Sequence, residues 1–143
     1  MSKKKKIFIS IGAVLLAGLI IGGIFLGLYL KNLKEYRERI KSITIEDIDI
    51  SKLSDGKYIG SYDAILNYAK VEVTVVDGKI TDVVFIEYKR VRGESAEDVI
   101  DKVKAQQTLQ VDVVTGATNS SNVILKAIEN ALKSTPVFTG ATK

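Results

Sequence analysis

The residues best suited to chemistry in this chain are residues 111–121, near its C-terminal end. They read Val-Asp-Val-Val-Thr-Gly-Ala-Thr-Asn-Ser-Ser, a short β-prone run with a glycine turn, and an amphipathic helix pattern follows. A helix that starts here brings free backbone N–H groups and the positive end of its dipole to one corner. The hydroxyls around that corner belong to Thr115, Thr118, Ser120 and Ser121. Such a corner suits a phosphate group.

The same residues also fit an ordinary capped helix after a tight turn. Ser, Thr and Asn are the usual helix-capping residues, and glycine supplies the turn. Physical chemistry alone leaves both interpretations open.

The pattern Asp-x-x-Thr-Gly-Ala-Thr at residues 112–118 resembles the flavinylation motif of the FMN-binding domain family. In that family the last Thr or Ser of the motif is esterified to the phosphate of FMN, so the resemblance implies Thr118 as the acceptor. The rest of the motif is Asp112, Thr115, Gly116 and Ala117. Backbone N–H groups from Asn119 through Ser120 to Ser121 are then the expected contacts of the phosphodiester.

The resemblance extends in family order through residues 55–60 and 75–83 to a helix that ends near Lys133. Thr139-Gly140-Ala141-Thr142 repeats the core of the motif, but Pro136 stands where Asp112 stands in the first copy. We expect no helix after this second copy and interpret it as a chance repeat in a flexible tail.

The resemblance implies covalent FMN, transferred from FAD by a separate magnesium-dependent flavin transferase. The family includes flavin-carrying subunits of sodium-translocating NADH:quinone oxidoreductases and related complexes, as well as free-standing extracytoplasmic electron carriers, which this chain resembles. The implied function is electron relay between a membrane quinone or dehydrogenase and an extracytoplasmic acceptor. Such a carrier has no catalytic residues of its own, because the flavin supplies the redox chemistry.

Two alternatives belong to other functional classes. The chain could hold a ligand non-covalently, or it could be an assembly subunit of a membrane redox complex. A hydrolase with Ser120 or Thr118 as nucleophile is poorly supported, because the chain has no histidine to act as base.

The amino-acid composition excludes several kinds of binding site and argues against one class of partner. The absence of cysteine and histidine excludes disulfides, a lipoprotein anchor and thiolate or zinc metal sites. The net charge of +4 equals that of the four lysines at residues 3–6, so the rest of the chain is formally neutral. This balance argues against a nucleic-acid partner.

Residues 7–30 carry no charge and would span about 36 Å as a helix, enough for a bilayer core of about 30 Å. Basic residues flank both ends, so charge alone leaves the orientation open. The short basic tail at residues 1–6 favours a signal anchor in the cell membrane, with the soluble part extracytoplasmic. Because no Ala-x-Ala-like cleavage site follows, we expect the anchor to stay attached. Gly18, Gly22, Gly23 and Gly27 form two Gly-x-x-x-Gly patterns, and thus a possible homodimer face, although glycine is common in such helices.

After the anchor we expect a juxtamembrane helix and linker at residues 31–54, the FMN-binding domain at 55–134 and a flexible tail at 135–143. The predicted fold is α+β, a small antiparallel sheet with helices packed on it. Strands are expected at residues 57–61, 69–76 and 79–88, with a hairpin turn at Asp77-Gly78. A helix capped by Ser95, a short strand at residues 111–114 and the final helix follow.

The isoalloxazine ring of FMN needs an apolar or aromatic wall. The candidates are Tyr58, Tyr62, Phe85 and Tyr88, each of which also fits ordinary packing. A basic loop with Lys89, Arg90 and Arg92 suits a reduced, anionic flavin, and also fits a solvated surface loop.

Overall fold

A computed structural model describes residues 2–90 and 96–137, which form two compact units. The first unit ends at Glu35, and the second begins at Tyr36. Helix α1, Lys3–Ser42, runs through this boundary. Its last turns, residues 36–42, therefore belong to the second unit and are here named the stalk turns.

The first unit consists of the greater part of α1. This helix is long and apolar enough to cross a membrane, and none of its residues is buried in the protein. The expected juxtamembrane helix is the C-terminal part of α1, which ends at Ser42. A Cβ added at any glycine of the two Gly-x-x-x-Gly patterns would meet no other atom within 4 Å. Dimerisation through this face stays a prediction.

In the second unit the described residues form a three-stranded antiparallel sheet in the order β1, β2, β3. Strand β1 is Gly56–Asp63, β2 is Tyr68–Val76 and β3 is Lys79–Lys89. The predicted hairpin joins β2 to β3, with positive φ angles of 51° at Asp77 and 68° at Gly78. Positive φ at both central residues is the requirement of a type I′ turn, which matches the twist of the strands.

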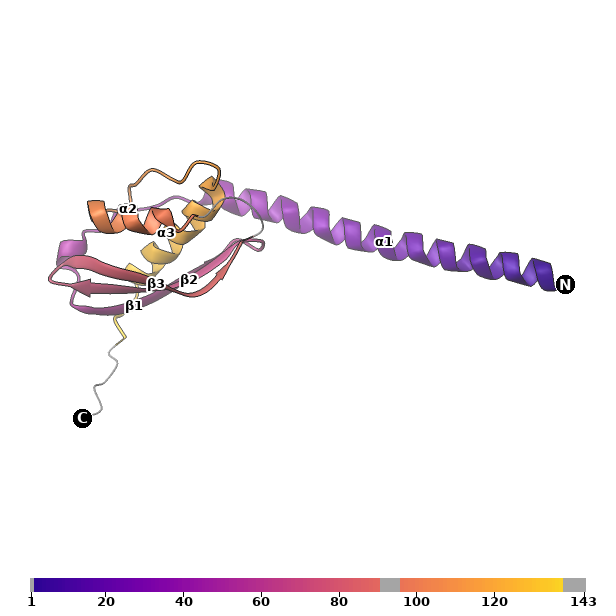
Figure 1. The fold of residues 1–143 in the computed structure, drawn as a ribbon, viewed down its shortest axis with the longest axis horizontal. Helices are drawn as coiled ribbons and strands as arrows, with labels where there is room; N and C mark the ends of the chain where they lie inside the picture. Colours follow the sequence, from indigo (N-terminus) through magenta and orange to yellow (C-terminus); the bar gives the residue numbers. More distant parts are fainter. Residues whose placement is uncertain (1, 91–95, 138–143) are drawn as a thin grey trace, which may run out of the picture. The chain divides into compact units, whose positions relative to one another are not determined.

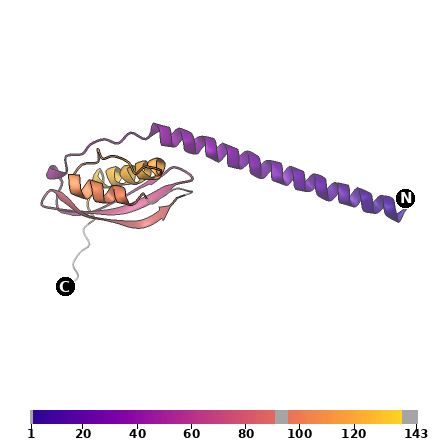
Figure 2. The same cartoon turned by 45° about the horizontal axis from the view of Figure 1, so that its top comes forward.

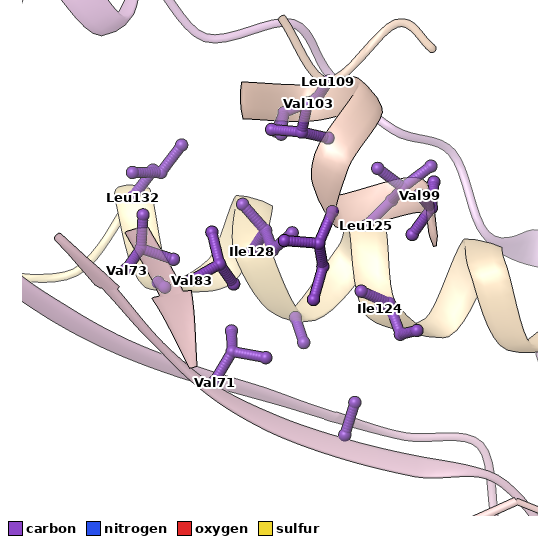
Figure 3. Packing of buried hydrophobic residues seen from close by; sticks show 14 of the residues in the cluster. Val71, Val73, Val83, Val99, Val103, Leu109, Ile124, Leu125, Ile128 and Leu132 are labelled. Carbon is purple, nitrogen blue, oxygen red and sulfur yellow. The ribbon is translucent and has the colours of Figure 1, made fainter. Parts of the chain in front are cut away.

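Two helices, α2 (Asp98–Gln106) and α3 (Thr118–Leu132), cover one face of this sheet (Figures 1 and 2). Alternation along β2 turns Val71, Val73 and Val75 to the covered face, where each is fully buried. Figure 3 shows their neighbours from both helices, among them Val103 and Ile128, pointing into the same space. The α+β fold predicted from the sequence is thus confirmed.

Helix α3 lies against β1 with almost no space between the two backbones. A Cβ added at Gly60 would lie 2.1 Å from the backbone nitrogen of Ala131 and 2.6 Å from the carbonyl oxygen of Ala127. The absent side chain of Gly60 therefore fixes how closely α3 can pack on the sheet.

Residues 43–49 cross α3 as an extended segment, followed by a short 3-10 helix at Ile50–Lys52. The carboxylate of Glu129 on α3, which is fully buried, accepts a hydrogen bond from the backbone N–H of Glu46 over 3.2 Å. The ammonium groups of Lys126 and Lys133 lie 3.0 Å and 2.7 Å from the same carboxylate. Glu129 therefore fastens this segment to α3.

The start of α2 differs from the prediction in part. Ser95, the predicted cap, lies outside the described residues, as does Arg92. The N-cap position is occupied by Glu97, and α2 begins at Asp98.

Candidate functional site

The turn before α3 is closed by one backbone hydrogen bond, from the N–H of Ala117 to the carbonyl oxygen of Val114 over 3.0 Å. Gly116 lies inside this turn with a φ angle of +80°. A side chain is rarely tolerated at such an angle, so the glycine of the motif is explained by the backbone conformation.

The short strand predicted at residues 111–114 is wrong, because this segment pairs with no strand among the residues that the structure describes. Two of its backbone groups bond to side chains from the two helices instead. The N–H of Val114 donates to the hydroxyl of Ser121 over 3.1 Å, and Lys102 donates to the carbonyl oxygen of Asp112 over 2.9 Å. The segment is thus held by α2 and α3.

The first turn of α3 is uncapped. Thr118 is the first helical residue, and the N-cap position is held by Ala117, whose side chain has no hydrogen-bonding group. Within residues 2–90 and 96–137, the N–H groups of Thr118, Asn119 and Ser120 donate no hydrogen bond. The interpretation of these residues as an ordinary side-chain cap is therefore wrong, and three N–H groups are available to an anion at the positive end of the helix.

The hydroxyls of the motif divide into an outer and an inner set. Thr115 and Thr118 are exposed, as is Asn119. Ser120 is 3 % exposed, and its hydroxyl accepts a hydrogen bond from the side-chain amide of Asn67 over 3.2 Å. Ser121 is fully buried against Val114, and its N–H donates to the carbonyl oxygen of Ala117.

The other motif residues are placed as follows. Asp112 and Gly116 are exposed, and Ala117 is 5 % exposed. Thr118 thus presents its hydroxyl to solvent from a turn whose other face is packed into the domain. A hydroxyl held in this way is accessible to a modifying enzyme.

An aromatic pair lies beneath the start of α3. The rings of Phe85 and Tyr88 stack with their centroids 4.7 Å apart and an interplanar angle of 20°. Burial raises the pKa of the Tyr88 phenol, and the nearby hydroxyl of Ser120 acts in the opposite direction. Tyr88 Oη is buried and makes no hydrogen bond within the described part of the chain. The pair therefore lies beside the first turn of α3, two residues from Thr118.

The other two candidates for an aromatic wall differ from each other. Tyr58 is 2 % exposed, and its hydroxyl donates to the carbonyl oxygen of Ser54 over 2.7 Å, so it belongs to the core and offers no face to a ligand. Tyr62 is half-buried and pairs with Ala69, which in turn pairs with Tyr88. Tyr62 and Tyr88 therefore share one row across the covered face of the sheet.

Of the predicted basic loop, Lys89 and Arg90 are described and exposed, whereas Arg92 lies outside the described residues. The charge of Arg90 acts to lower the pKa of the Tyr88 phenol, against the effect of Glu97. At least one cation of this loop thus acts electrostatically on the aromatic pair.

Two residues at this corner have no sequence signal. Asn67, which is 2 % exposed, donates from its side-chain amide to Ser120 and also to the hydroxyl of Tyr36, each over 3.2 Å. Neither Asn67 nor Tyr36 belongs to a motif that the sequence reveals. The burial of the polar Asn67 just before β2 indicates a structural role, because buried polar groups are normally hydrogen-bonded.

In a comparison with protein families, residues 67–133 match the model of the FMN-binding domain. This segment, slightly less than half of the chain, is similar to the FMN-binding domain. The match begins at Asn67, spans β2, β3, α2 and α3, and includes the whole motif at residues 112–118. It supports a flavin-binding protein with FMN as its cofactor. No curated protein and no solved structure matches the chain.

The segment that matches the FMN-binding domain offers features that fit this cofactor. Three N–H groups that donate no hydrogen bond within the described residues lie at the start of α3, where a phosphate is favoured. The exposed Thr118 begins the same helix, and the stacked Phe85 and Tyr88 lie beside Ser120 in its first turn.

Proposed function

We propose that this chain is a membrane-anchored, extracytoplasmic flavoprotein that carries FMN covalently on Thr118 and relays electrons. The observation that carries the proposal is the exposed hydroxyl of Thr118 at the uncapped start of α3, within the segment that matches the FMN-binding domain. Bound FMN supplies one- and two-electron transfer, and the chain supplies attachment and placement.

Attachment joins the side-chain oxygen of Thr118 to the phosphorus of the FMN half of FAD. The bond between this phosphorus and the bridging oxygen of the pyrophosphate breaks, AMP leaves, and the hydroxyl proton is released. A separate flavin transferase catalyses the exchange, as the resemblance to the FMN-binding domain family implies. The resulting phosphodiester carries one negative charge, which a helix N-terminus favours by about 0.3–1 kcal/mol.

The surrounding residues have distinct roles. Gly116 allows the turn that exposes Thr118, and the N–H groups of Asn119 and Ser120 donate to the phosphodiester. Phe85 and Tyr88 supply aromatic surface to the isoalloxazine ring. Lys89 and Arg90 favour a reduced, anionic flavin through their charge.

The membrane anchor holds the domain at the extracytoplasmic surface of the membrane. α1 crosses the bilayer, the basic residues 3–6 stay in the cytoplasm, and the domain faces the extracytoplasmic side. A covalent bond is useful there, because FMN that dissociated would be lost by dilution. The partners in electron transfer are a membrane quinone or dehydrogenase and an extracytoplasmic acceptor.

The test is the intact mass of the full-length protein, purified from membranes of cells that also produce an active flavin transferase. The expected result is one added FMN minus water, which peptide mapping locates on Thr118. Thr118→Val is expected to lose the addition entirely. The matched control is Thr142→Val in the second Thr-Gly-Ala-Thr, which is expected to keep it.

An unmodified wild-type mass beside a transferase that modifies other proteins would contradict the proposal. That outcome would favour a non-covalent ligand-binding protein or an assembly subunit.

A further inference from the structure

The amide of Asn67 connects the stalk turns to the first turn of α3. Its Nδ2 atom donates to Tyr36 Oη over 3.2 Å and to Ser120 Oγ over 3.2 Å, and Asn67 itself is almost completely buried. Two hydrogen bonds therefore link the hydroxyl of Tyr36 through Asn67 to Ser120. Ser120 lies two positions after Thr118 in the sequence. At about 1.5 Å and about 100° per residue, Thr118 lies about 3 Å from Ser120 along the helix axis but on the opposite, exposed side of the helix. The ribityl chain of an FMN attached there must therefore span this distance for the ring to reach Tyr36.

Further contacts hold the stalk turns against the domain. Arg39 donates to the carbonyl oxygen of Asp63 over 3.1 Å, at the end of β1 and just before the loop that contains Asn67. Tyr36 and Ile40, one turn apart on the same face of α1, pack against the core. Tyr36 is thus fixed at this corner by apolar packing and by hydrogen bonds.

The side chain of Tyr36 is half-buried, so part of its surface stays open to solvent. A phenol ring combines apolar faces with a polar tip, and here the tip is already bonded to Asn67. The ring is therefore suited to contact a flat, apolar ligand beside the start of α3.

We propose that the stalk turns complete the flavin site and that the ring of Tyr36 packs against the isoalloxazine ring. The proposal rests on the attachment of FMN to Thr118. Tyr36 lies outside the segment that matches the FMN-binding domain, whereas Thr118 lies inside it. The attachment residue and the proposed contact of the isoalloxazine ring therefore belong to different parts of the chain. Attachment is then a property of residues 67–133, whereas the environment of the ring also depends on the stalk turns.

The experiment uses the full-length protein with FMN attached, in detergent, and compares Tyr36→Leu with wild type. Leucine keeps apolar packing against the core, and Tyr36→Phe keeps the aromatic ring while losing the hydroxyl. The control is Tyr68→Leu, a half-buried tyrosine in β2 whose neighbour Ala69 faces the helices, so that its own side chain lies on the opposite face. Intact mass, flavin fluorescence and the midpoint reduction potential are measured for each variant.

We expect Tyr36→Leu to keep the full FMN mass but to show a several-fold rise in flavin fluorescence and a shifted midpoint potential. A tyrosine stacked on a flavin quenches its fluorescence by electron transfer, and leucine does not. Tyr36→Phe also lacks the oxidisable phenol, so its fluorescence is expected to rise as in Tyr36→Leu, but its midpoint potential should shift less because the aromatic ring is preserved. Tyr68→Leu is expected to match wild type.

Two results would overturn the inference in distinguishable ways. If Tyr36→Leu carries FMN and keeps the fluorescence and potential of wild type, Tyr36 is not part of the site, while the proposed function stands. If wild-type protein carries no FMN beside an active transferase, both proposals fail.

Discussion

The hydroxyl of Ser121 accepts a hydrogen bond from the backbone N–H of Val114 over 3.1 Å. This bond joins the segment before the turn to the first turn of α3, and Ser121 is fully buried where it forms. With the bond between Ala117 and Val114, it closes the loop that presents Thr118. The position of the candidate acceptor therefore depends on a serine three residues after it.

Replacing Ser121 with Ala is expected to lower the free energy of unfolding by about 1–3 kcal/mol, because the N–H of Val114 loses its partner in a partly buried place. Urea denaturation of the domain measures the change. Asn119→Ala, two residues earlier and exposed, is the control and should have little effect. A Ser121→Ala variant as stable as wild type would show that the bond contributes nothing.

Gly116→Ala tests the turn itself. The φ angle of +80° is costly for alanine by about 1–2 kcal/mol, so the turn is expected to open or distort. We expect less covalent FMN per protein at a fixed time of exposure to the transferase, measured by intact mass. The matched control is Gly140→Ala in the second Thr-Gly-Ala-Thr, and equal FMN content in both variants would argue against the turn as the presenting element.

Sequence patterns predict most of this fold, because strands and tight turns depend mainly on residues that are close in the sequence. The alternation of Val71, Val73 and Val75 and the Asp77-Gly78 turn each depend on a few neighbouring residues. The strand predicted at residues 111–114 failed because its backbone partners are side chains of α2 and α3, which no local pattern reveals. The contact between Asn67 and Ser120 joins residues 53 positions apart, and so escapes prediction for the same reason.

Gly60→Ala tests the contact between β1 and α3. The added Cβ would lie 2.1 Å from a backbone nitrogen of α3, which has no flexible side chain to move away. The helix must shift from the sheet, so we expect a loss of about 3 kcal/mol or more in the free energy of unfolding. Ser61→Ala, the exposed neighbour, serves as control in the same thermal or urea denaturation. Equal stability of the two variants would contradict the close packing.

Tyr88→Phe removes a hydroxyl that is buried and makes no hydrogen bond within the described residues. Because burial of such a group costs free energy, its removal is expected to leave the flavin-free protein as stable as wild type or slightly more stable. The ring and its stacking on Phe85 remain. Thermal denaturation of the flavin-free protein checks this, and Tyr58→Phe, which loses a bond to Ser54, is expected to be destabilised in the same assay. A clear loss of stability in Tyr88→Phe would mean that its hydroxyl has a partner.

The carboxylate of Glu129 makes stability depend on pH. Burial acts to raise its pKa, but hydrogen bonds from Lys133 and Lys126 and from the backbone N–H of Glu46 outweigh that effect, so the pKa lies below its ordinary value of 4.5. A carboxyl whose pKa is lowered on folding stabilises the protein above its unfolded pKa, and this contribution is lost as the pH falls through the folded value. The window of loss therefore lies below about pH 4.5.

Glu129→Gln keeps the shape of the side chain but removes its charge. At neutral pH we expect a loss of about 1–3 kcal/mol in the free energy of unfolding, because two lysines lose a charged acceptor. The difference from wild type is expected to shrink as the pH falls below 4.5, where the wild-type carboxyl also becomes neutral. Urea denaturation across this pH range measures both effects, and Glu46→Gln, an exposed partner of Lys133, is the control with a small change. A difference between Glu129→Gln and wild type that stayed constant with pH would show that the charge of Glu129 does not stabilise the fold.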